Sequence, residues 1–263
     1  MARSGGMFGT TRGFGRAFAF VAVAAALAGC GATSYSWGWH VILPETPQGR
    51  ANLAFLIDGL WMTVMLSVVS IMAAVVLGMI VAMCALSPNK ALNWINRIYV
   101  EGVRAVPLLV LLLWVYYGLP VVMGLQLGVF MAGVVSLALS DSAFEAEIFR
   151  AGIQSIAKGQ SEAAYSVGLS KWHTFRLVVL PQAIRRILPA LGNQFVYVLK
   201  MSSLISVIGA QELTRKATEL IVIEPRPLEI YTFLVIEYLL LILLVSWLVR
   251  RMEKKMAQAG RQH

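Results

Sequence analysis

Few residues of this chain have the types and spacing that covalent chemistry requires. The histidines are scattered along the sequence, at His40, His173 and His263. The two cysteines, Cys30 and Cys84, have neither metal-ligand spacing nor the pattern of a disulfide framework. The phosphate-binding pattern GxxxxGK[ST] does not occur either. The sequence therefore predicts no metal site, no nucleophilic active site and no phosphate loop in this chain.

The other residues that could act on a ligand are polar side chains inside long apolar runs. Asp141 and Glu145 are four residues apart, so a helix places them on one face, where two carboxylates repel each other unless a proton or a cation intervenes. Asn193, Tyr197 and Lys200 also share one helical face. Because ionisable groups at membrane depth usually face a cavity or a partner, these five residues are candidates for a substrate path.

Lys200 has two open interpretations. In the structural one it pairs with Asp141 or Glu237 and holds helices together, or it extends to the outer membrane surface. In the functional one it lines the path and binds the carboxylate of a zwitterionic substrate. Glu147 and Arg150, which are three residues apart in the same apolar run as Asp141, are interpreted as a structural ion pair.

Composition indicates that membrane helices position these residues. Of the 263 residues, 59% are hydrophobic and only 13% are charged, and mean hydropathy is +0.74. A soluble domain could not cover so much apolar surface with so few charges, so we predict a polytopic membrane protein. The net charge of +9 could indicate a nucleic-acid partner. Basic residues that hold loops in the cytoplasm explain it better, and we expect no nucleic-acid binding.

Five apolar segments are long enough to cross a bilayer, for which roughly 20 residues are needed. They are residues 55–86, 98–119, 128–149, 187–208 and 230–249. Pro107 falls inside the second segment, which we expect to remain one span, because a membrane helix tolerates proline when neighbours satisfy the freed carbonyl. The predicted fold class is all-α: a polytopic membrane protein of five core helices plus one N-terminal apolar segment.

The N-terminal segment, residues 1–32, allows two interpretations. Arg12 and Arg16 precede an apolar stretch that ends in the letters LAGC, which resembles a lipoprotein signal with lipidation at Cys30. The alternative is an uncleaved membrane helix, which we favour because the rest of the chain is polytopic. In either case residues 33–54, which contain SYSWGWHVILPETPQG, form a periplasmic segment with tryptophans suited to a membrane surface.

Lysine and arginine residues predict the orientation, because cytoplasmic loops carry an excess of them. They gather in residues 87–97, in residues 150–186 and in the basic tail 251–263, and they are sparse in residues 33–54, 120–127 and 209–228. We therefore expect the stretch 150–186 and the C-terminus to face the cytoplasm.

The stretch 150–186 is polar and amphipathic, and it predicts two short helices with a break between them. Its first half has a stripe of mostly small apolar residues at helical spacing, namely Ile156, Ala163, Ala164 and Val167. Small residues on an exposed stripe allow another protein surface to approach closely. A loop that only connected two spans could be shorter and need not be amphipathic.

The break is expected at Gly168, because glycine readily takes the positive φ that follows a helix C-cap. Glu162 suits the positive end of the first short helix. Ser170 is expected to cap the second short helix, and Leu180 and Pro181 are expected to end it.

With these features the stretch resembles the EAA loop of ATP-binding-cassette (ABC) importer permeases. The matching residues are Glu162, Ala163, Ala164, Gly168, Leu180 and Pro181. The flanking stretches AEIFRAGIQSIAKGQ, RAVPLLVLLLWVYYGLP, VLPQAIRRILPALGNQFVYVLK and SSLISVIGAQELTR resemble the polar amino acid uptake branch of that family. The resemblance runs from about Phe55 to Arg250.

The resemblance implies a type I permease core over residues 55–250, in the bacterial inner membrane, that works as a homodimer or with a paralogous permease. It also implies two cytoplasmic ATPase subunits, which bind ATP and Mg in place of this chain, and a substrate-binding protein on the periplasmic face. The substrate would be a polar amino acid or a similar small zwitterion, and the matching loop residues would couple the ATPases to the permease. Two features depart from the pattern: the N-terminal segment is extra, and Met201 stands where an acidic or amide residue is expected.

Two other function classes fit less well. A membrane-anchored lipoprotein or receptor component of an uptake system, suggested by LAGC, would have one lipid anchor and a soluble body, whereas this sequence has repeated apolar spans. An intramembrane enzyme would need an acid, a base or a metal set within the spans. The predicted function is therefore translocation by a permease subunit that does no covalent chemistry and is powered by ATP hydrolysis in a partner chain.

Overall fold

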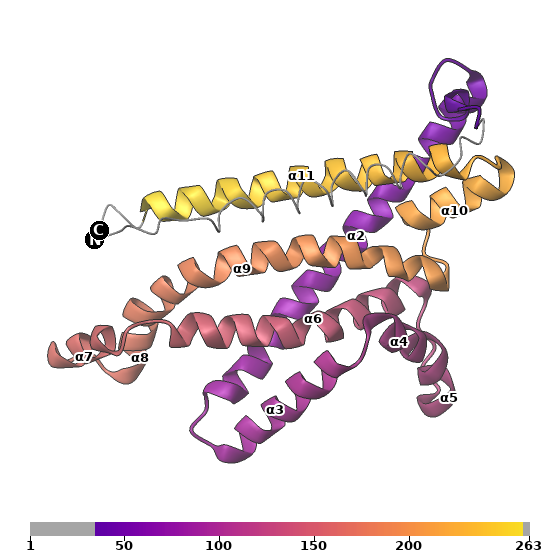
Figure 1. Ribbon diagram of the computed structural model, residues 1–263. Coiled ribbons are helices and arrows are strands. Elements are labelled where there is room, and N and C mark those ends of the chain that lie inside the picture. The colour runs from indigo at the N-terminus through magenta and orange to yellow at the C-terminus, as the bar shows by residue number, and fades with distance from the viewer. Residues whose placement is uncertain (1–34, 260–263) are drawn as a thin grey trace, which may run out of the picture. The chain divides into compact units, whose positions relative to one another are not determined.

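The computed structural model describes residues 35–259, and within them every regular element is a helix (Figure 1). Among the described residues, those up to Gly38 belong to one unit and those from Trp39 onward belong to another, which contains the predicted core. Both interpretations of residues 1–32, the uncleaved helix and the lipidation at Cys30, fall outside the described residues.

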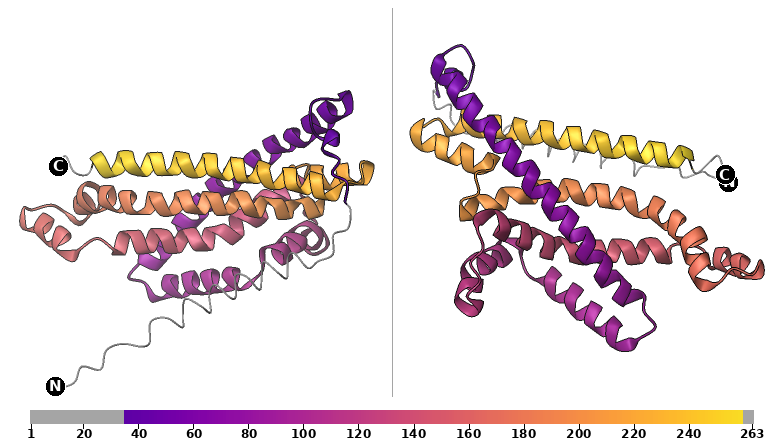
Figure 2. Two further views of the ribbon diagram at one scale, coloured as in Figure 1. Left: turned by 45° about the horizontal axis from the view of Figure 1, so that its top comes forward. Right: turned by 180° about the vertical axis from the view of Figure 1, so that it is seen from behind.

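Helix α2 (Pro47–Leu86) begins earlier than the predicted boundary at residue 55. It follows the short turn η1 (Trp39–Val41), and Thr46 caps it by accepting the N–H of Gly49 at 2.9 Å. A helix of 40 residues is roughly 60 Å long, about twice the roughly 30 Å of the hydrocarbon core. Figures 1 and 2 show that α2 runs obliquely across the other long helices.

The prediction of one uninterrupted second span is wrong. The pieces are α3 (Lys90–Ala105), α4 (Leu108–Leu113), the π-helical turn η2 (Trp114–Gly118) and α5 (Leu119–Met123). The axis bends by 97° between α3 and the pieces that follow. Pro107 causes this, because its ring disfavours helical geometry in the residue before it, and Val106 accordingly has φ −92° and ψ 123°.

Helix α6 (Val129–Gln154) lies in the middle of the bundle and packs very closely on α2. A Cβ added at Gly78 of α2 would lie only 2.5 Å from the Cβ of Glu145, so the two helices touch almost backbone to backbone. Other small buried residues of α2 continue this contact surface: Ser67, Ser70, Ala74 and Ala82.

The predicted loop 150–186 is shorter than expected, because α6 extends to Gln154 and a new helix starts at Lys171. The elements after α6 are α7 (Lys158–Ser166), α8 (Lys171–Thr174), the π-helical turn η3 (Phe175–Val179), α9 (Leu180–Met201) and the 3₁₀ turn η4 (Ser202–Ile208). From α8 onward they form one long candidate span that ends at Ile208.

Helices α10 (Leu213–Ile223) and α11 (Pro227–Ala259) complete the described chain. Figures 1 and 2 show α7 and α8 at one end of the bundle, and α10 with the start of α2 at the other. Within residues 35–259, four helices are long and apolar enough to cross a membrane, and the bent pair of α3 with α4 and α5 makes a fifth. This agrees with the predicted five-helix bundle.

Candidate coupling loop and substrate path

Gly168 breaks the predicted coupling loop where the sequence predicts it. Its φ is +84°, in the left-handed region that favours glycine. The N–H of Gly168 donates to the carbonyl of Tyr165 at 2.9 Å, and the N–H of Leu169 donates to the carbonyl of Ala164 at 3.1 Å. These two bonds form the Schellman arrangement, which satisfies the last carbonyls of α7 and reverses the chain direction within a few residues.

The second half of the loop differs from the prediction. Ser170 caps α8 as expected, since its hydroxyl oxygen accepts the N–H of His173 at 3.3 Å. The predicted stop at Leu180 and Pro181 is wrong, because α8, η3 and α9 are one continuous helix. In the widened turn η3 the N–H of Leu180 donates to the carbonyl of Phe175. This π-type turn accommodates Pro181, which has no N–H and would clash with the carbonyl four residues earlier in a regular helix.

The predicted apolar stripe of the loop divides between two surfaces. Ala164 and Ile156 are buried in their own chain, whereas Ala163 is exposed and Val167 is 78% exposed. Glu162 is also exposed, beside a recess of about 370 Å³ between the end of α6, α7 and η3. Glu162, Ala163 and Val167 are therefore free to meet another protein, while Ala164 fixes α7 to the bundle.

Asp141 and Glu145 share one face of α6 as predicted, and that face is buried, with only 3% and 0% of the two residues exposed. Gln194 of α9 donates to Oδ1 of Asp141. Within the described residues, Oδ2 of Asp141 and both carboxyl oxygens of Glu145 have no hydrogen-bond partner. Nearby, the hydroxyls of Tyr99 and Ser142 lie 2.7 Å apart. The two carboxyl groups are thus enclosed between helices of one chain.

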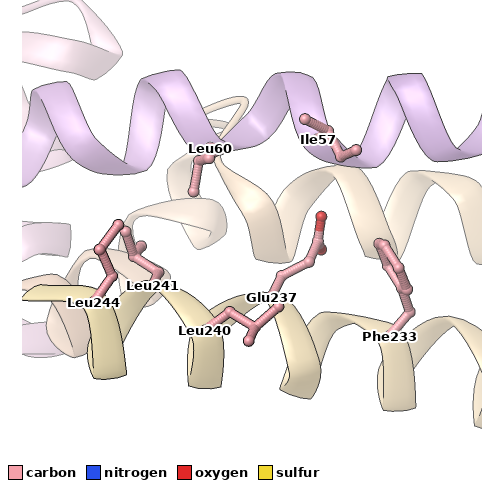
Figure 3. A pocket seen from close by; sticks show the side chains of 7 residues that line it. All are labelled: Ile57, Leu60, Phe233, Glu237, Leu240, Leu241 and Leu244. Carbon is pink, nitrogen blue, oxygen red and sulfur yellow. The ribbon is translucent and has the colours of Figure 1, made fainter.

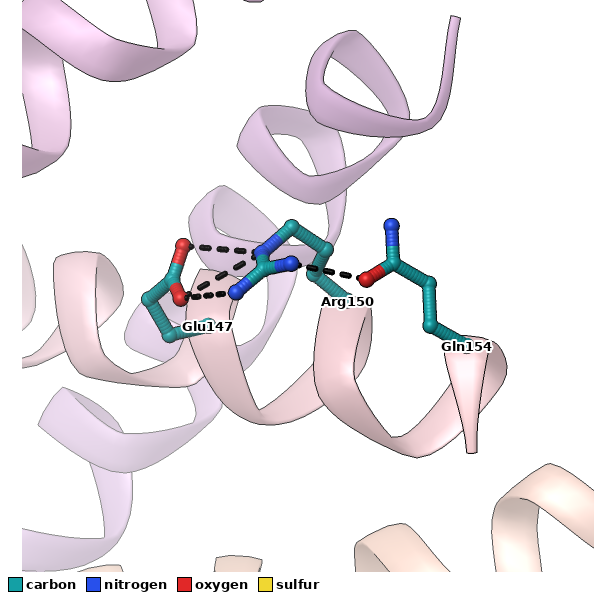
Figure 4. A network of polar contacts seen from close by, with 3 residues as sticks. All are labelled: Glu147, Arg150 and Gln154. Carbon is teal, nitrogen blue, oxygen red and sulfur yellow. Dashed lines mark hydrogen bonds and ion pairs between the residues drawn. The ribbon is translucent and has the colours of Figure 1, made fainter. Parts of the chain in front are cut away.

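Glu147 and Arg150 form the ion pair that the sequence predicted (Figure 4). Nη2 of Arg150 donates to Oε2 of Glu147 at 2.7 Å, and Nη1 donates to the side-chain oxygen of Gln154 at 2.7 Å. All three residues belong to the last turns of α6. This network fixes the end of α6 from which the candidate coupling loop leaves.

Asn193, Tyr197 and Lys200 are all exposed on α9, as their spacing predicts. The ring of Tyr197 lies 6.5 Å from the ring of Phe144 on α6. The guanidinium of Arg104, in the last turn of α3, lies 4.8 Å from the centre of the same Phe144 ring. An exposed surface therefore runs across α3, α6 and α9, and we call Arg104, Phe144, Tyr197, Asn193 and Lys200 the three-helix face.

Sequence reasoning missed Arg104 and Phe144. A charged residue within the apolar segment 98–119 was a signal for Arg104, because such residues are rare at membrane depth. Phe144 gives no signal in an apolar helix, and no spacing relates it to Arg104, since the two residues lie on different helices.

The ion pairs considered for Lys200 are wrong. Asp141 contacts Gln194 instead, and no ion pair of Lys200 occurs among residues 35–259. Glu237 points from α11 toward α2 in a groove of about 350 Å³ (Figure 3). The other residues lining this groove are apolar: Ile57, Leu60, Phe233, Leu240, Leu241 and Leu244. Lys200 keeps two interpretations, extension to the outer surface and a place on the path.

At the end of the bundle opposite to the loop, Glu212 caps α10 and is fully buried. Its Oε1 accepts the N–H of Arg215 and its Oε2 accepts the hydroxyl of Tyr238 on α11, both at 2.8 Å. The N–H of Leu213 donates to the hydroxyl of Thr63 on α2 at 3.2 Å. Burial raises the pKa of the Glu212 carboxyl, and the hydrogen bonds that it accepts offset part of the rise. The described residues hold no group of three His, Cys, Asp or Glu that could bind a metal ion.

Comparison with known proteins agrees with this arrangement. The family of binding-protein-dependent transport system inner membrane components matches residues 74–258. The glutamine transport system permease protein GlnP of Escherichia coli K12 is 36% identical over 219 residues, which cover 83% of this chain and 97% of GlnP. The probable glutamine ABC transporter permease protein GlnM of Bacillus subtilis 168 is 38% identical over 208 residues, or 79% of this chain and 96% of GlnM.

Solved structures share the fold. The crystal structure of an amino acid ABC transporter with histidines superposes with a TM-score of 0.77 at 36% identity, covering 84% of this chain and 100% of that one. The inward-facing methionine transporter MetNI gives a TM-score of 0.68 at 20% identity, covering 79% and 98%. The resemblance that the loop residues predicted is confirmed. The chain belongs to the family of binding-protein-dependent transport system inner membrane components, the permeases of ABC importers.

Proposed function

We propose that this chain carries a polar amino acid across the bacterial inner membrane, with glutamine as the first candidate. Two relatives that match most of the chain are described as glutamine permeases, and the similar crystal structure as an amino acid transporter. The three-helix face supports the assignment, because it offers a cation, an amide and a hydroxyl to a small zwitterion.

One observation carries the mechanism: part of the cytoplasmic loop and part of the three-helix face belong to the same helix. The helix runs from Lys171 through η3 to Met201 without a break. Tyr197 is 26 residues after Lys171, which is roughly 40 Å along a helix. A force that displaces α8 therefore tilts the helix that carries Tyr197 and Lys200. The chain needs no covalent chemistry of its own for this step.

Membership of this permease family supports the proposed partners. Two cytoplasmic ATPase subunits bind ATP and Mg and contact Glu162, Ala163 and the turn at Gly168. Ala164 is buried and Pro181 lies inside a helix, so these two residues set the shape of the loop from within. A second permease, identical or paralogous, faces the path, and a substrate-binding protein delivers the amino acid to the α10 end. The C-terminus and the loop face the cytoplasm, because basic residues gather there.

The candidate path residues separate into two roles. Asn193, Tyr197 and Lys200 are exposed, and we place them on the path itself. Asp141 and Glu145 are enclosed within one chain, so we place them behind the path, where they set the packing of α2, α6 and α9.

Reconstitution tests the proposal. This chain is co-expressed with its candidate ATPase and binding-protein chains, and the purified complex is placed in vesicles with ATP on the ATPase side. Uptake of each of the twenty ¹⁴C-labelled amino acids is then measured, with ATP-free vesicles as the control. We expect ATP-dependent uptake of a polar amino acid. A complex that contains an active ATPase but takes up none of the twenty would refute the substrate class, and a permease that binds no ATPase would refute the partner assignment.

A further inference from the structure

Arg104 is a charged residue with an unusual environment. Its side chain is exposed, and its guanidinium lies 4.8 Å from the centre of the Phe144 ring. Among residues 35–259 the guanidinium makes no hydrogen bond and no ion pair within 4.0 Å. A cation above an aromatic ring is stabilised by the ring face, but the N–H groups at the edge of the guanidinium stay free to donate.

Arg104 lies beside the middle part of α6, although its side chain is exposed. Phe144, which it covers, is ten residues before Gln154 at the end of α6 and fifteen after Val129 at its start. At about 1.5 Å per residue, the ring is roughly 15 Å from one end of this span and roughly 22 Å from the other. A guanidinium at this depth cannot simply extend its side chain into water, so a paired anion is expected.

The carboxylates of this chain near α3 and α6 are already engaged or enclosed. Glu101 pairs with Arg97 at 2.7 Å, and Glu147 pairs with Arg150 at 2.7 Å. Glu147 also attracts Arg104 electrostatically, but from beyond ion-pair distance. Asp141 accepts from Gln194, and Glu145 is fully buried against α2. No carboxylate of the described residues therefore lies within ion-pair distance of Arg104, and its N–H groups stay available to an anion from outside this chain.

The geometry points to Arg104 as the residue that holds the carboxylate of the transported amino acid, with Phe144 and Tyr197 as the aromatic surface beside it. The inference rests on the proposed function and names the group that recognises the substrate. A guanidinium edge matches a carboxylate with two parallel hydrogen bonds, which a lysine ammonium cannot reproduce. Lys200 is less suited, because its ammonium is a compact point charge without the planar edge of a guanidinium.

Two other roles for Arg104 give different results in an experiment. A cation in the last turn of α3 favours the negative end of the helix dipole, and then Arg104→Lys would act like the native residue. A carboxylate of the second permease could also pair with Arg104, and then the guanidinium would be covered in the assembled complex whether substrate is present or not.

Chemical protection distinguishes these roles in the complete reconstituted complex. An arginine-specific dicarbonyl reagent is applied during uptake, and modification of Arg104 is measured by mass spectrometry. The probe is L-glutamine, or whichever amino acid enters the vesicles fastest in the uptake assay. The comparison compound is the corresponding amino alcohol, which has no carboxylate. Arg97 is the internal control, because it is an exposed arginine of the same helix whose partner is Glu101.

We expect Arg104 to react freely without substrate, to be protected at least fivefold by the amino acid and to be unprotected by the amino alcohol. Modification of Arg97 by the reagent should be the same with and without the amino acid. In the uptake assay we expect Arg104→Gln to lower the rate at least tenfold, Arg104→Lys to restore little of it, and Arg97→Gln to leave it within twofold of the native rate. An Arg104 that is unreactive from the start, or that reacts equally with and without the amino acid, overturns the inference while uptake itself upholds the proposed function. Full activity of Arg104→Lys overturns it as well. If no amino acid enters the vesicles, the proposed function fails first.

Discussion

The two ends of the bundle hold their short helices in opposite ways. At one end, α10 is anchored on both sides by polar contacts. Nζ of Lys216 lies 2.9 Å from Oδ2 of Asp58 on α2, and the hydroxyl of Tyr238 on α11 donates to the buried carboxyl of Glu212. Each of these groups finds its partner within the chain, so α10 is a fixed part of the permease.

At the other end, α7 and α8 leave large side chains exposed. Tyr165 is 48% exposed, Trp172 is 63% exposed and Val167 is 78% exposed. Apolar groups gathered on a surface are typical of a site that another protein covers. The α10 end also exposes Val222 at 82% and Ile223 at 69%, so the contrast lies in the polar anchors that hold α10 within one chain. For the loop end we propose that a partner covers the exposed side chains. Substitutions at the two ends should therefore damage different properties: stability at one end and coupling at the other.

The largest expected effect is at the contact between α2 and α10. A Cβ added at Gly59 would lie 2.9 Å from the backbone nitrogen of Leu213, and backbone cannot move aside as a flexible side chain can. We expect Gly59→Leu to destabilise the fold by about 1–3 kcal/mol or more, with less protein in the membrane and a lower unfolding midpoint in detergent. Gly102→Leu is the matched control, since a Cβ there meets nothing within 4 Å. Equal midpoints for the two variants would contradict the anchored contact.

The next effect is at the loop and should leave the fold intact. Gly168 has φ +84°, and a Cβ there would meet nothing within 4 Å, so the only penalty for Gly168→Val is conformational. A non-glycine residue in this region costs about 1–3 kcal/mol, which α7 can relieve by turning away. We expect native amounts of membrane protein but loss of uptake and of ATPase stimulation by loaded binding protein.

Gly159→Ala is the control for this variant, because Gly159 lies in α7 with open space around it and without a positive φ. Native stimulation in Gly168→Val would mean that the loop does not transmit the force.

A smaller effect separates the two alanines of the loop. Ala163 is exposed, so Ala163→Trp should keep the fold and weaken only the contact with the ATPase, measured as less ATPase retained in a pull-down. Ala164 is 5% exposed, so Ala164→Trp must displace its own chain and should lower the unfolding midpoint as well. If both variants lose ATPase and keep the same midpoint, the assignment of an outer and an inner alanine fails.

Local chemistry explains which parts of this comparison could be predicted from the sequence. The break at Gly168 and the cap at Ser170 depend on neighbours within a few residues, and both were predicted correctly. The two prolines were not. Pro107 ends a helix because Val106 is extended, whereas Pro181 continues one because the turn before it widens. Whether a proline ends a helix or continues it depends on the backbone conformation of the turn before it. No residue pattern in the sequence predicted that conformation.

The burial of the candidate path residues could not be predicted from the sequence either, because it depends on contacts between different helices. Spacing predicted that Asp141 and Glu145 share a face and that Tyr197 and Lys200 share another. Which of these faces is buried depends on α2, where Gly78 lets the backbone approach Glu145. The three-helix face likewise joins residues from α3, α6 and α9, so it exists only once the bundle has formed.

The smallest expected effect is a pH dependence at the anchored end. Burial raises the pKa of Glu212 above its ordinary value of 4.5, so the folded state holds a proton there more tightly than the unfolded chain does. The stabilisation from this proton is fully present below pH 4.5 and is lost as the pH rises through the folded-state pKa.

Glu219 on the same helix provides a control of opposite sign. Hydrogen bonds from Gln211 and then Arg215 lower its pKa, so its contribution is present above 4.5 and is lost as the pH falls. We therefore expect Glu212→Gln to flatten the decline of the unfolding midpoint between pH 4.5 and pH 8, since a neutral amide can still accept from Arg215 and has no proton to lose. Glu219→Gln should not flatten that decline.

Because α10 is anchored through Glu212, uptake in the Glu212→Gln variant should also vary less with pH over this range. An unchanged slope in Glu212→Gln would mean that the buried carboxyl does not control the stability of this end, and that the contacts of Lys216 and Leu213 hold α10 by themselves.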